Sequence, residues 1–163
     1  MSVEVKSFDV IFECDAHNAG GMRTDMAVRM VKPDLMEFAL ASDEGSFHGG
    51  GGTAPPPLTY FAAGLASCLM TQLRAFSKRL RIEVGEMKIS TRCHWQGEQT
   101  GREPYVTAPV GFDLDIEIGT DAPLEEQLRL IETAKKGCFI EQTLVRENII
   151  AHRLKVGEDW HDV

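Results

Sequence analysis

Apolar and polar residues alternate over several short segments of the chain, which is the pattern of strands with one buried face. The clearest segment runs from Phe112 to Ile118, where every second residue is apolar and the residues between are acidic. Residues 17–21 and 32–34, rich in Gly, Asn, Pro and Asp, are turn signals. The pattern predicts six strands, at residues 3–14, 24–31, 35–41, 84–95, 106–118 and 149–156.

A different period, with apolar residues every three or four positions, predicts helices. The longest such stretch covers residues 57–80, starts at Pro57 after two further prolines and contains many Ala, Gly and Ser residues. We expect it to be a buried central helix. Residues 122–136, capped by Asp121, and residues 138–146 predict two shorter helices separated by Gly137. The expected order is βββ-α-ββ-αα-β in a single α+β domain over residues 1–163.

Composition and charge argue against several classes of protein, namely nucleic-acid-binding, membrane-spanning and secreted proteins. The 163 residues carry a formal net charge of -8, which disfavours nucleic-acid binding, because phosphate neutralisation needs clustered cations. No apolar run is long enough to span a membrane, and the first residues do not have the pattern of a secretory signal. We therefore expect a cytoplasmic protein without a membrane partner, whose four cysteines are reduced at rest.

Two of the cysteines are candidates for chemistry, although each also has a purely structural explanation. Cys68 falls on the apolar stripe of the long predicted helix, where a free cysteine often serves as a small buried hydrophobe. Cys138 follows a helix-ending glycine and opens the next helix, where unpaired N–H groups favour a thiolate. The spacing alone does not show whether these two residues meet.

Other candidate motifs are incomplete. There is no Cys-x-x-Cys, and Cys93-His94 has no second pair at zinc spacing, so neither a thioredoxin motif nor a metal site is expected. Gly49–Gly52 is not followed by Gly-Lys-Ser/Thr, so the run is interpreted as a flexible loop rather than a phosphate loop. His48 lies in the same loop and is interpreted as an ordinary loop residue.

The segment TAPPPLTYFAAGLASC, residues 53–68, resembles the central-helix signature of the OsmC/Ohr family: a Gly/Thr-rich loop, proline, a helix start rich in alanine, and a cysteine. The second segment, GCFIEQTL at residues 137–144 followed by a strand, is similar to the family's later cysteine motif. The order of elements also agrees. This resemblance implies an intertwined α+β homodimer with long central helices inside and active sites at the subunit interface.

The resemblance also implies an activity. Characterised members are thiol peroxidases, so Cys68 would be the peroxidatic thiolate and Cys138 the resolving thiol that condenses with its sulfenic acid. The partners would be a small organic hydroperoxide and an external dithiol reductant, a lipoyl group in the better-known members. No bound cofactor or metal is implied.

An arginine near the first strands serves the thiolate in the family. Gly20-Gly21-Met22-Arg23 resembles that motif with an offset of one residue, so Arg23 is the candidate, with Arg29 as the second choice.

The chain departs from the family pattern at the position where a glutamate normally anchors the arginine, because Leu58 and Thr59 stand there. Asp43, Glu44 and Glu141 are candidate replacements. Phe139 also stands where the family usually has proline. The alternative function is a non-catalytic dimer that senses oxidants or binds a small apolar ligand.

Overall fold

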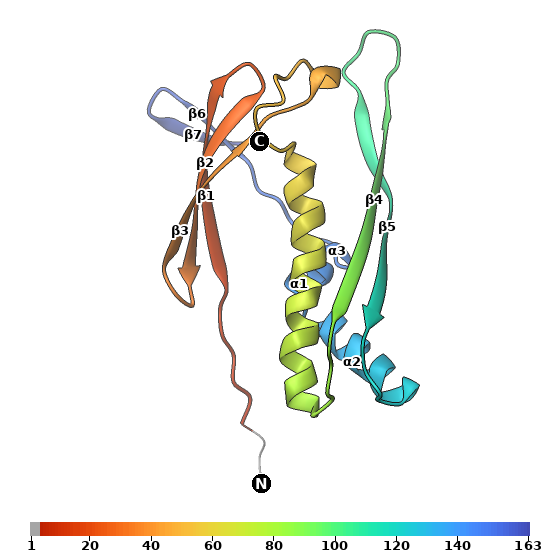
Figure 1. Cartoon of the computed structure of the whole chain (residues 1–163). Coiled ribbons are helices and arrows are strands. Elements are labelled where there is room, and N and C mark those ends of the chain that lie inside the picture. The colour runs from red at the N-terminus through yellow and green to blue at the C-terminus, as the bar shows by residue number, and fades with distance from the viewer. Residues whose placement is uncertain (1–3) are drawn as a thin grey trace. The chain divides into compact units, whose positions relative to one another are not determined.

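The structure is a computed structural model that describes residues 4–163. Its backbone contacts divide the chain into two compact units, Met1–Phe61 and Ala62–Val163. The predicted α+β class and the antiparallel sheets are present, and the two units are described in turn (Figure 1). The prediction of a single domain stays a prediction.

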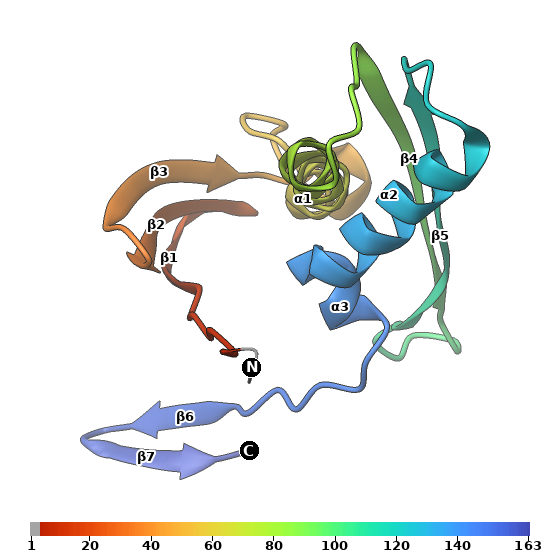
Figure 2. The same ribbon diagram turned by 90° about the horizontal axis from the view of Figure 1, so that it is seen from below.

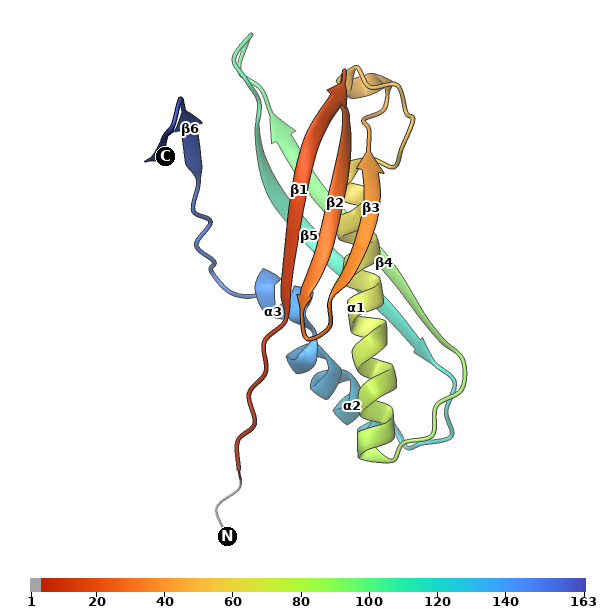
Figure 3. The same ribbon diagram turned by 90° about the vertical axis from the view of Figure 1, so that its left-hand side faces the viewer.

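The first unit contains an antiparallel sheet in the order β1-β2-β3. Its strands are β1 (Ile11–Gly20), β2 (Arg23–Lys32) and β3 (Met36–Ser42), which lie side by side in Figure 3. The predicted first strand, residues 3–14, is wrong in its bounds: residues 4–10 are not in a strand, and Val3 lies outside the described residues. β1 instead continues to Gly20, where Gly20 and Gly21 adopt positive φ angles of 108° and 56° in the turn to β2.

The loop after β3 contains a short 3-10 helix, η1 (Ser46–His48), and the glycine run. A Cβ atom on Gly50 would lie 1.8 Å from the carbonyl oxygen of Glu44, so no other residue fits this path. Gly49 and Gly52 have positive φ angles, which glycine adopts without strain. The interpretation of the run as flexible is therefore incomplete, because Gly49, Gly50 and Gly52 are required by the shape of the loop.

The long helix α1 (Pro57–Leu80) has the bounds that the sequence predicts. Leu65, Leu69, Leu73 and Ser77 form its one fully buried stripe, since the spacing of three to four residues keeps them on one face. The other faces of α1 are partly or fully exposed in the chain by itself, so the predicted burial applies to a stripe rather than to the whole helix.

The core of the second unit forms where α1 meets a hairpin and two further helices. The hairpin pairs β4 (Met87–Glu98) with β5 (Val106–Ile118), and α2 (Leu124–Gly137) and α3 (Phe139–Leu144) follow it (Figure 2). The alternation in β5 holds, because its apolar residues from Phe112 to Ile118 are partly buried and its acidic residues are exposed. The buried cluster consists of Leu69, Leu73, Ile82, Leu130, Ala134 and Cys138.

Three predicted details of this unit are wrong. The strand predicted at residues 84–95 lies at Met87–Glu98. Pro123, not Asp121, is the N-cap of α2, and no side chain caps the helix. The single last strand predicted at residues 149–156 is instead a small exposed hairpin of β6 (Arg153–Val156) and β7 (Asp159–Asp162). Within the described part of the chain, no helix is both long and apolar enough to cross a membrane.

Candidate active site

The structure brings the two candidate cysteines together. Cys68 lies on α1, and Cys138 lies in the junction between α2 and α3. Cys68 packs against the buried cluster that contains Cys138, the two thiols act directly on one another, and no disulfide joins them. Two residues 70 positions apart in sequence therefore form one thiol pair, which the spacing alone could not show.

Two close approaches of backbone to side chain explain why this pair forms. A Cβ atom on Gly64, one helical turn before Cys68, would lie 3.2 Å from Ile140 Cδ1 of α3. A Cβ atom on Gly137 would lie only 2.5 Å from Phe76 Cε2 of α1. Because glycine occupies both positions, the α2–α3 junction can pack tightly on α1 at both ends of the segment that carries Cys68.

Burial separates the two thiols. Cys138 has a relative exposure of 0%, whereas Cys68 is partly exposed. Desolvation is the largest cause that raises the pKa of Cys138, to about 11, and the neighbouring Cys68 thiol and the charge of Glu141 raise it further. The backbone N–H of Glu141 acts in the opposite direction, although no side-chain capping hydrogen bond is formed.

The expectation that a helix start favours the Cys138 thiolate is therefore wrong for the reduced protein. α3 has only six residues, so few aligned peptide dipoles face the sulfur, and full burial outweighs them. Cys138 stays a protonated thiol at neutral pH. Cys68, as the more exposed sulfur, is the one that a small molecule can reach.

Arg23 begins β2 in the first unit, and its guanidinium is held by two neighbours. Its Nη2 lies 2.9 Å from Asp25 Oδ1, and its Nη1 donates to Thr53 Oγ1 at 2.9 Å. Thr53 is in turn fixed by Asp43, whose Oδ2 accepts from the Thr53 backbone N–H at 2.9 Å and from its hydroxyl at 2.8 Å. Arg23 is thus oriented by a chain of hydrogen bonds that ends on a carboxylate.

Asp43 is the buried member of this chain, with a relative exposure of 3%. Hydrogen bonds from the backbone and the side chain of Thr53 are the largest causes that lower its pKa, so it is ionised at neutral pH. Of the three predicted replacements for the missing glutamate, Asp43 therefore reaches Arg23 through Thr53. Glu44 instead faces His48, with its Oε2 3.3 Å from His48 Nδ1. The catalytic role of Arg23 stays a prediction.

The profile of the OsmC-like protein family matches residues 49–153, a segment that includes both cysteines. The chain belongs to the OsmC-like family. Its solved relatives include an OsmC-like hydroperoxide resistance protein from Jannaschia sp. CCS1, which is 47% identical with a TM-score of 0.66. That alignment covers 94% of this chain and 98% of the Jannaschia protein.

Distant OsmC-like structures share the fold. An organic hydroperoxide resistance protein from Legionella pneumophila is 19% identical, with a TM-score of 0.56 over 86% of this chain and 91% of its own. An OsmC-like protein from Mycoplasma pneumoniae is 14% identical, with a TM-score of 0.57 over 86% of this chain and 89% of its own. No curated protein sequence matches the chain. The family resemblance inferred from the two cysteine motifs is confirmed.

The remaining predicted residues lie elsewhere. Arg29, the second choice for the site arginine, pairs across the sheet with Asp15 at 2.8 Å and Glu13 at 3.4 Å. Cys14 is exposed on β1. Cys93 faces Phe112 across the β4–β5 hairpin, and burial raises the pKa of its thiol.

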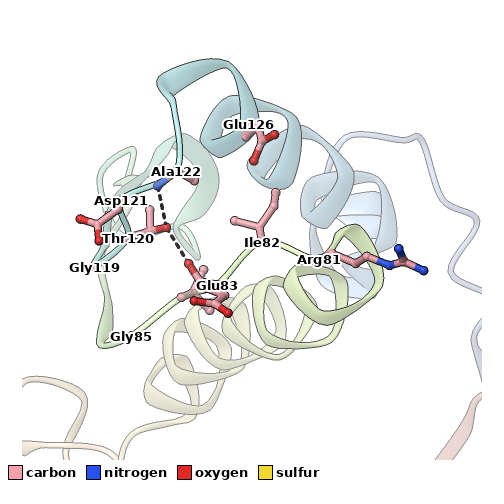
Figure 4. A pocket seen from close by; sticks show the side chains of 10 residues that line it. Arg81, Ile82, Glu83, Gly85, Gly119, Thr120, Asp121, Ala122 and Glu126 are labelled. Atoms are coloured by element: carbon pink, nitrogen blue, oxygen red, sulfur yellow. Dashed lines mark hydrogen bonds between the residues drawn. The ribbon is translucent and has the colours of Figure 1, made fainter.

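A hollow of about 470 Å³ opens where the segment after α1 meets the segment after β5, and neither cysteine lines it. Figure 4 shows Thr120 at its wall, donating to the Glu83 carbonyl at 2.6 Å and accepting from the Ala122 N–H at 3.1 Å. Because no cysteine lines this hollow, thiol chemistry has no place there.

Sequence reasoning missed the packing glycines. Gly64 was visible only as one of many small residues, and Gly137 only as a helix breaker. A glycine within four residues of each candidate cysteine was the available signal. The contact that gives it meaning requires the fold.

Proposed function

We propose that the protein is a thiol-dependent peroxidase that reduces organic hydroperoxides through Cys68 and Cys138. The contact between the two thiols carries this proposal, because a sulfenic acid formed on one sulfur has its resolving partner already beside it. Their unequal exposure supports this division of roles, in which the partly exposed Cys68 meets the hydroperoxide and the buried Cys138 resolves.

The reaction takes place in three steps. The Cys68 thiolate attacks the terminal peroxide oxygen and the O–O bond breaks, so that Cys68 becomes a sulfenic acid. The alkoxide leaves and takes a proton from water to become the alcohol. Cys138 then attacks that sulfur, and water is lost as the disulfide forms. An external dithiol, of which a lipoyl group is the expected example, reopens the disulfide by exchange and restores both thiols. Arg23 would orient the peroxide with its fork of donors.

The functional unit in this proposal is a homodimer. Large apolar side chains are exposed at several places along the chain, including Phe12 on β1 at 58%, Ile149 before β6 at 99% and Trp160 on β7 at 57% relative exposure. Apolar residues in such number are normally covered by a partner in a soluble protein. Light scattering of the purified chain should therefore give about twice the mass of the 18.1 kDa monomer.

The decisive experiment counts thiols in the reduced protein before and after one equivalent of cumene hydroperoxide, with mass spectrometry of the linked peptides. The proposal expects the rapid loss of two thiols and a Cys68–Cys138 peptide. Survival of all four thiols would mean that the protein does not perform this chemistry.

The buried, high-pKa Cys138 also favours a second candidate, a redox sensor that oxidises once without turning over. A fully buried disulfide sulfur is poorly accessible to a reductant. Repeated consumption of hydroperoxide in the presence of dihydrolipoamide would exclude the sensor. A single equivalent consumed, with the disulfide persisting, would favour it.

A further inference from the structure

Glu141 holds a buried carboxylate oxygen that the packing of the second unit does not explain. Among the residues that the structure describes, no group donates a hydrogen bond to its Oε2, which is fully buried. Buried polar atoms without a partner cost free energy, and most of those in folded proteins are paired. An oxygen of this kind is available to receive a proton.

Glu141 is placed so that it acts on Cys138. It lies in the first turn of α3, three residues after Cys138, and residues three apart share one face of a helix. Both its backbone N–H and its carboxylate act on the Cys138 sulfur, with opposite signs. The other charged groups that act on the Glu141 carboxylate are Lys135, which lowers its pKa, and Glu132, which raises it; burial is the largest cause and leaves the pKa raised.

We propose that Glu141 accepts the proton of the Cys138 thiol when the disulfide forms, and passes it to the departing hydroxide. This inference rests on the proposed peroxidase function, because it concerns the second step of that reaction. Its physical basis is charge. Ionising Cys138 beside an ionised Glu141 would place two negative charges in one buried site, which is unfavourable. Transfer of the proton from sulfur to carboxylate keeps a single negative charge throughout.

The step balances without any further reagent. The S–H bond of Cys138 breaks as its proton moves to the Glu141 carboxylate, and the sulfur attacks the sulfenic sulfur of Cys68. The S–S bond forms, the S–O bond breaks, and the leaving hydroxide takes the proton from Glu141 to become water. The sulfenic sulfur is reduced, the Cys138 sulfur is oxidised, and Glu141 returns to a carboxylate.

The test is a single-turnover experiment on E141Q. Cumene hydroperoxide is mixed with the reduced protein, and the Cys68 sulfenic acid is trapped with dimedone while disulfide formation is followed by mass spectrometry. Oxidation of Cys68 should keep its wild-type rate, but disulfide formation should slow by ~10²-fold, the usual contribution of a general base. Sulfenic acid should accumulate, as is also expected for C138S, which lacks the resolving thiol. The matched control is E125Q, which removes an exposed carboxylate of α2 that does not act on Glu141 and should form the disulfide at the wild-type rate.

A pH profile separates proton transfer from a structural role. Above the raised pKa of the Glu141 carboxylate, the wild-type rate of disulfide formation should level off, because the carboxylate is then ionised and ready to accept the proton. The E141Q rate should instead rise in proportion to hydroxide, and E141D should keep the level profile at a lower rate. If E141Q does not fold, the E141D profile decides alone: a level profile supports the inference, and a hydroxide-dependent one overturns it.

The two proposals fail in different ways. A wild-type protein that forms no sulfenic acid overturns the peroxidase function itself. A wild-type protein that forms the disulfide, together with E141Q forming it at the same rate and with the same pH profile, overturns only the role of Glu141.

Discussion

Two polar clusters in this protein are assembled by opposite means. The thiol cluster, Cys68, Cys138 and Glu141, belongs to the second unit and is held by close packing at Gly64 and Gly137. The arginine cluster, Arg23, Thr53 and Asp43, belongs to the first unit and is held by hydrogen bonds of 2.8 to 2.9 Å. One cluster depends on shape and the other on paired donors and acceptors.

The two modes of assembly have opposite electrostatic results. In the thiol cluster, burial raises the pKa values of Cys138 and Glu141 and so favours their neutral forms. In the arginine cluster, hydrogen bonds from Thr53 lower the pKa of Asp43 and favour its charged form. Burial therefore suits groups that must exchange protons, whereas a hydrogen-bonded carboxylate suits a permanent charge.

The largest expected effect comes from removing the sulfur that begins the chemistry. Cys68→Ser should abolish the consumption of cumene hydroperoxide in a coupled assay with dihydrolipoamide, because a serine hydroxyl is not ionised at neutral pH. Cys14→Ser, which alters an exposed cysteine of the first unit, is the matched control and should keep full activity. Hydroperoxide consumption that persists in Cys68→Ser would break the comparison, since the thiol cluster would then not be the reaction centre.

Removing the charge of the arginine cluster tests whether it serves the reaction at all. Arg23→Met should lower kcat/KM for cumene hydroperoxide by about 10²-fold, in the range of other positioned donors that stabilise developing charge. Arg29→Met on the same strand is the comparison, because Arg29 pairs with Asp15 and Glu13 of β1 instead of with the Thr53 loop. An equal loss in both variants would assign the effect to the charge or stability of the sheet.

The sequence predicted elements better than it predicted contacts. The period of apolar residues placed α1 at its observed bounds and β5 likewise, since both patterns depend only on local geometry. The start of β1 and the final hairpin were misplaced, because the apolar pattern continues through residues 4–10 and 149–152, which have no strand partner in the described part of the chain.

The same distinction applies to the candidate site: the sequence indicated its residues but not their contacts. The family resemblance identified the two cysteines and Arg23 as site residues, but it did not predict the pKa of Cys138 or the hydrogen bonds of Arg23. The pKa of Cys138 depends on complete burial beneath α1, and the link from Arg23 to Asp43 depends on a threonine 30 residues away from the arginine. Both are long-range properties that neither spacing nor helix position encodes.

A smaller effect should follow from filling the space that lets the thiol cluster pack. In Gly137→Ala, the new methyl group would lie 2.5 Å from Phe76 Cε2 and 2.7 Å from Cζ, so the ring or the α2–α3 junction must shift. We expect a loss of about 1 to 3 kcal/mol in the free energy of unfolding, as for other overpacked cores, together with slower disulfide formation. Gly111→Ala is the control, because nothing lies within 4 Å of its Cβ position. Equal stability of Gly137→Ala and the wild type in urea unfolding would contradict assembly by packing.

The smallest expected effect, and the one that depends on pH, belongs to Asp43. Because its pKa is lowered in the folded state, the unfolded chain binds its proton more readily, so the ionised carboxylate stabilises the fold above the unfolded pKa. That contribution is lost as the pH falls through the folded pKa. Asp43→Asn should therefore lower the melting temperature by a few degrees at pH 7, and the difference from the wild type should shrink below about pH 4. The control is Asp25→Asn, whose exposed carboxylate faces Arg23 and should change stability little. A deficit in Asp43→Asn that stays constant from pH 7 to pH 3 would mean that the shape of the side chain, and not its charge, holds Thr53 in place.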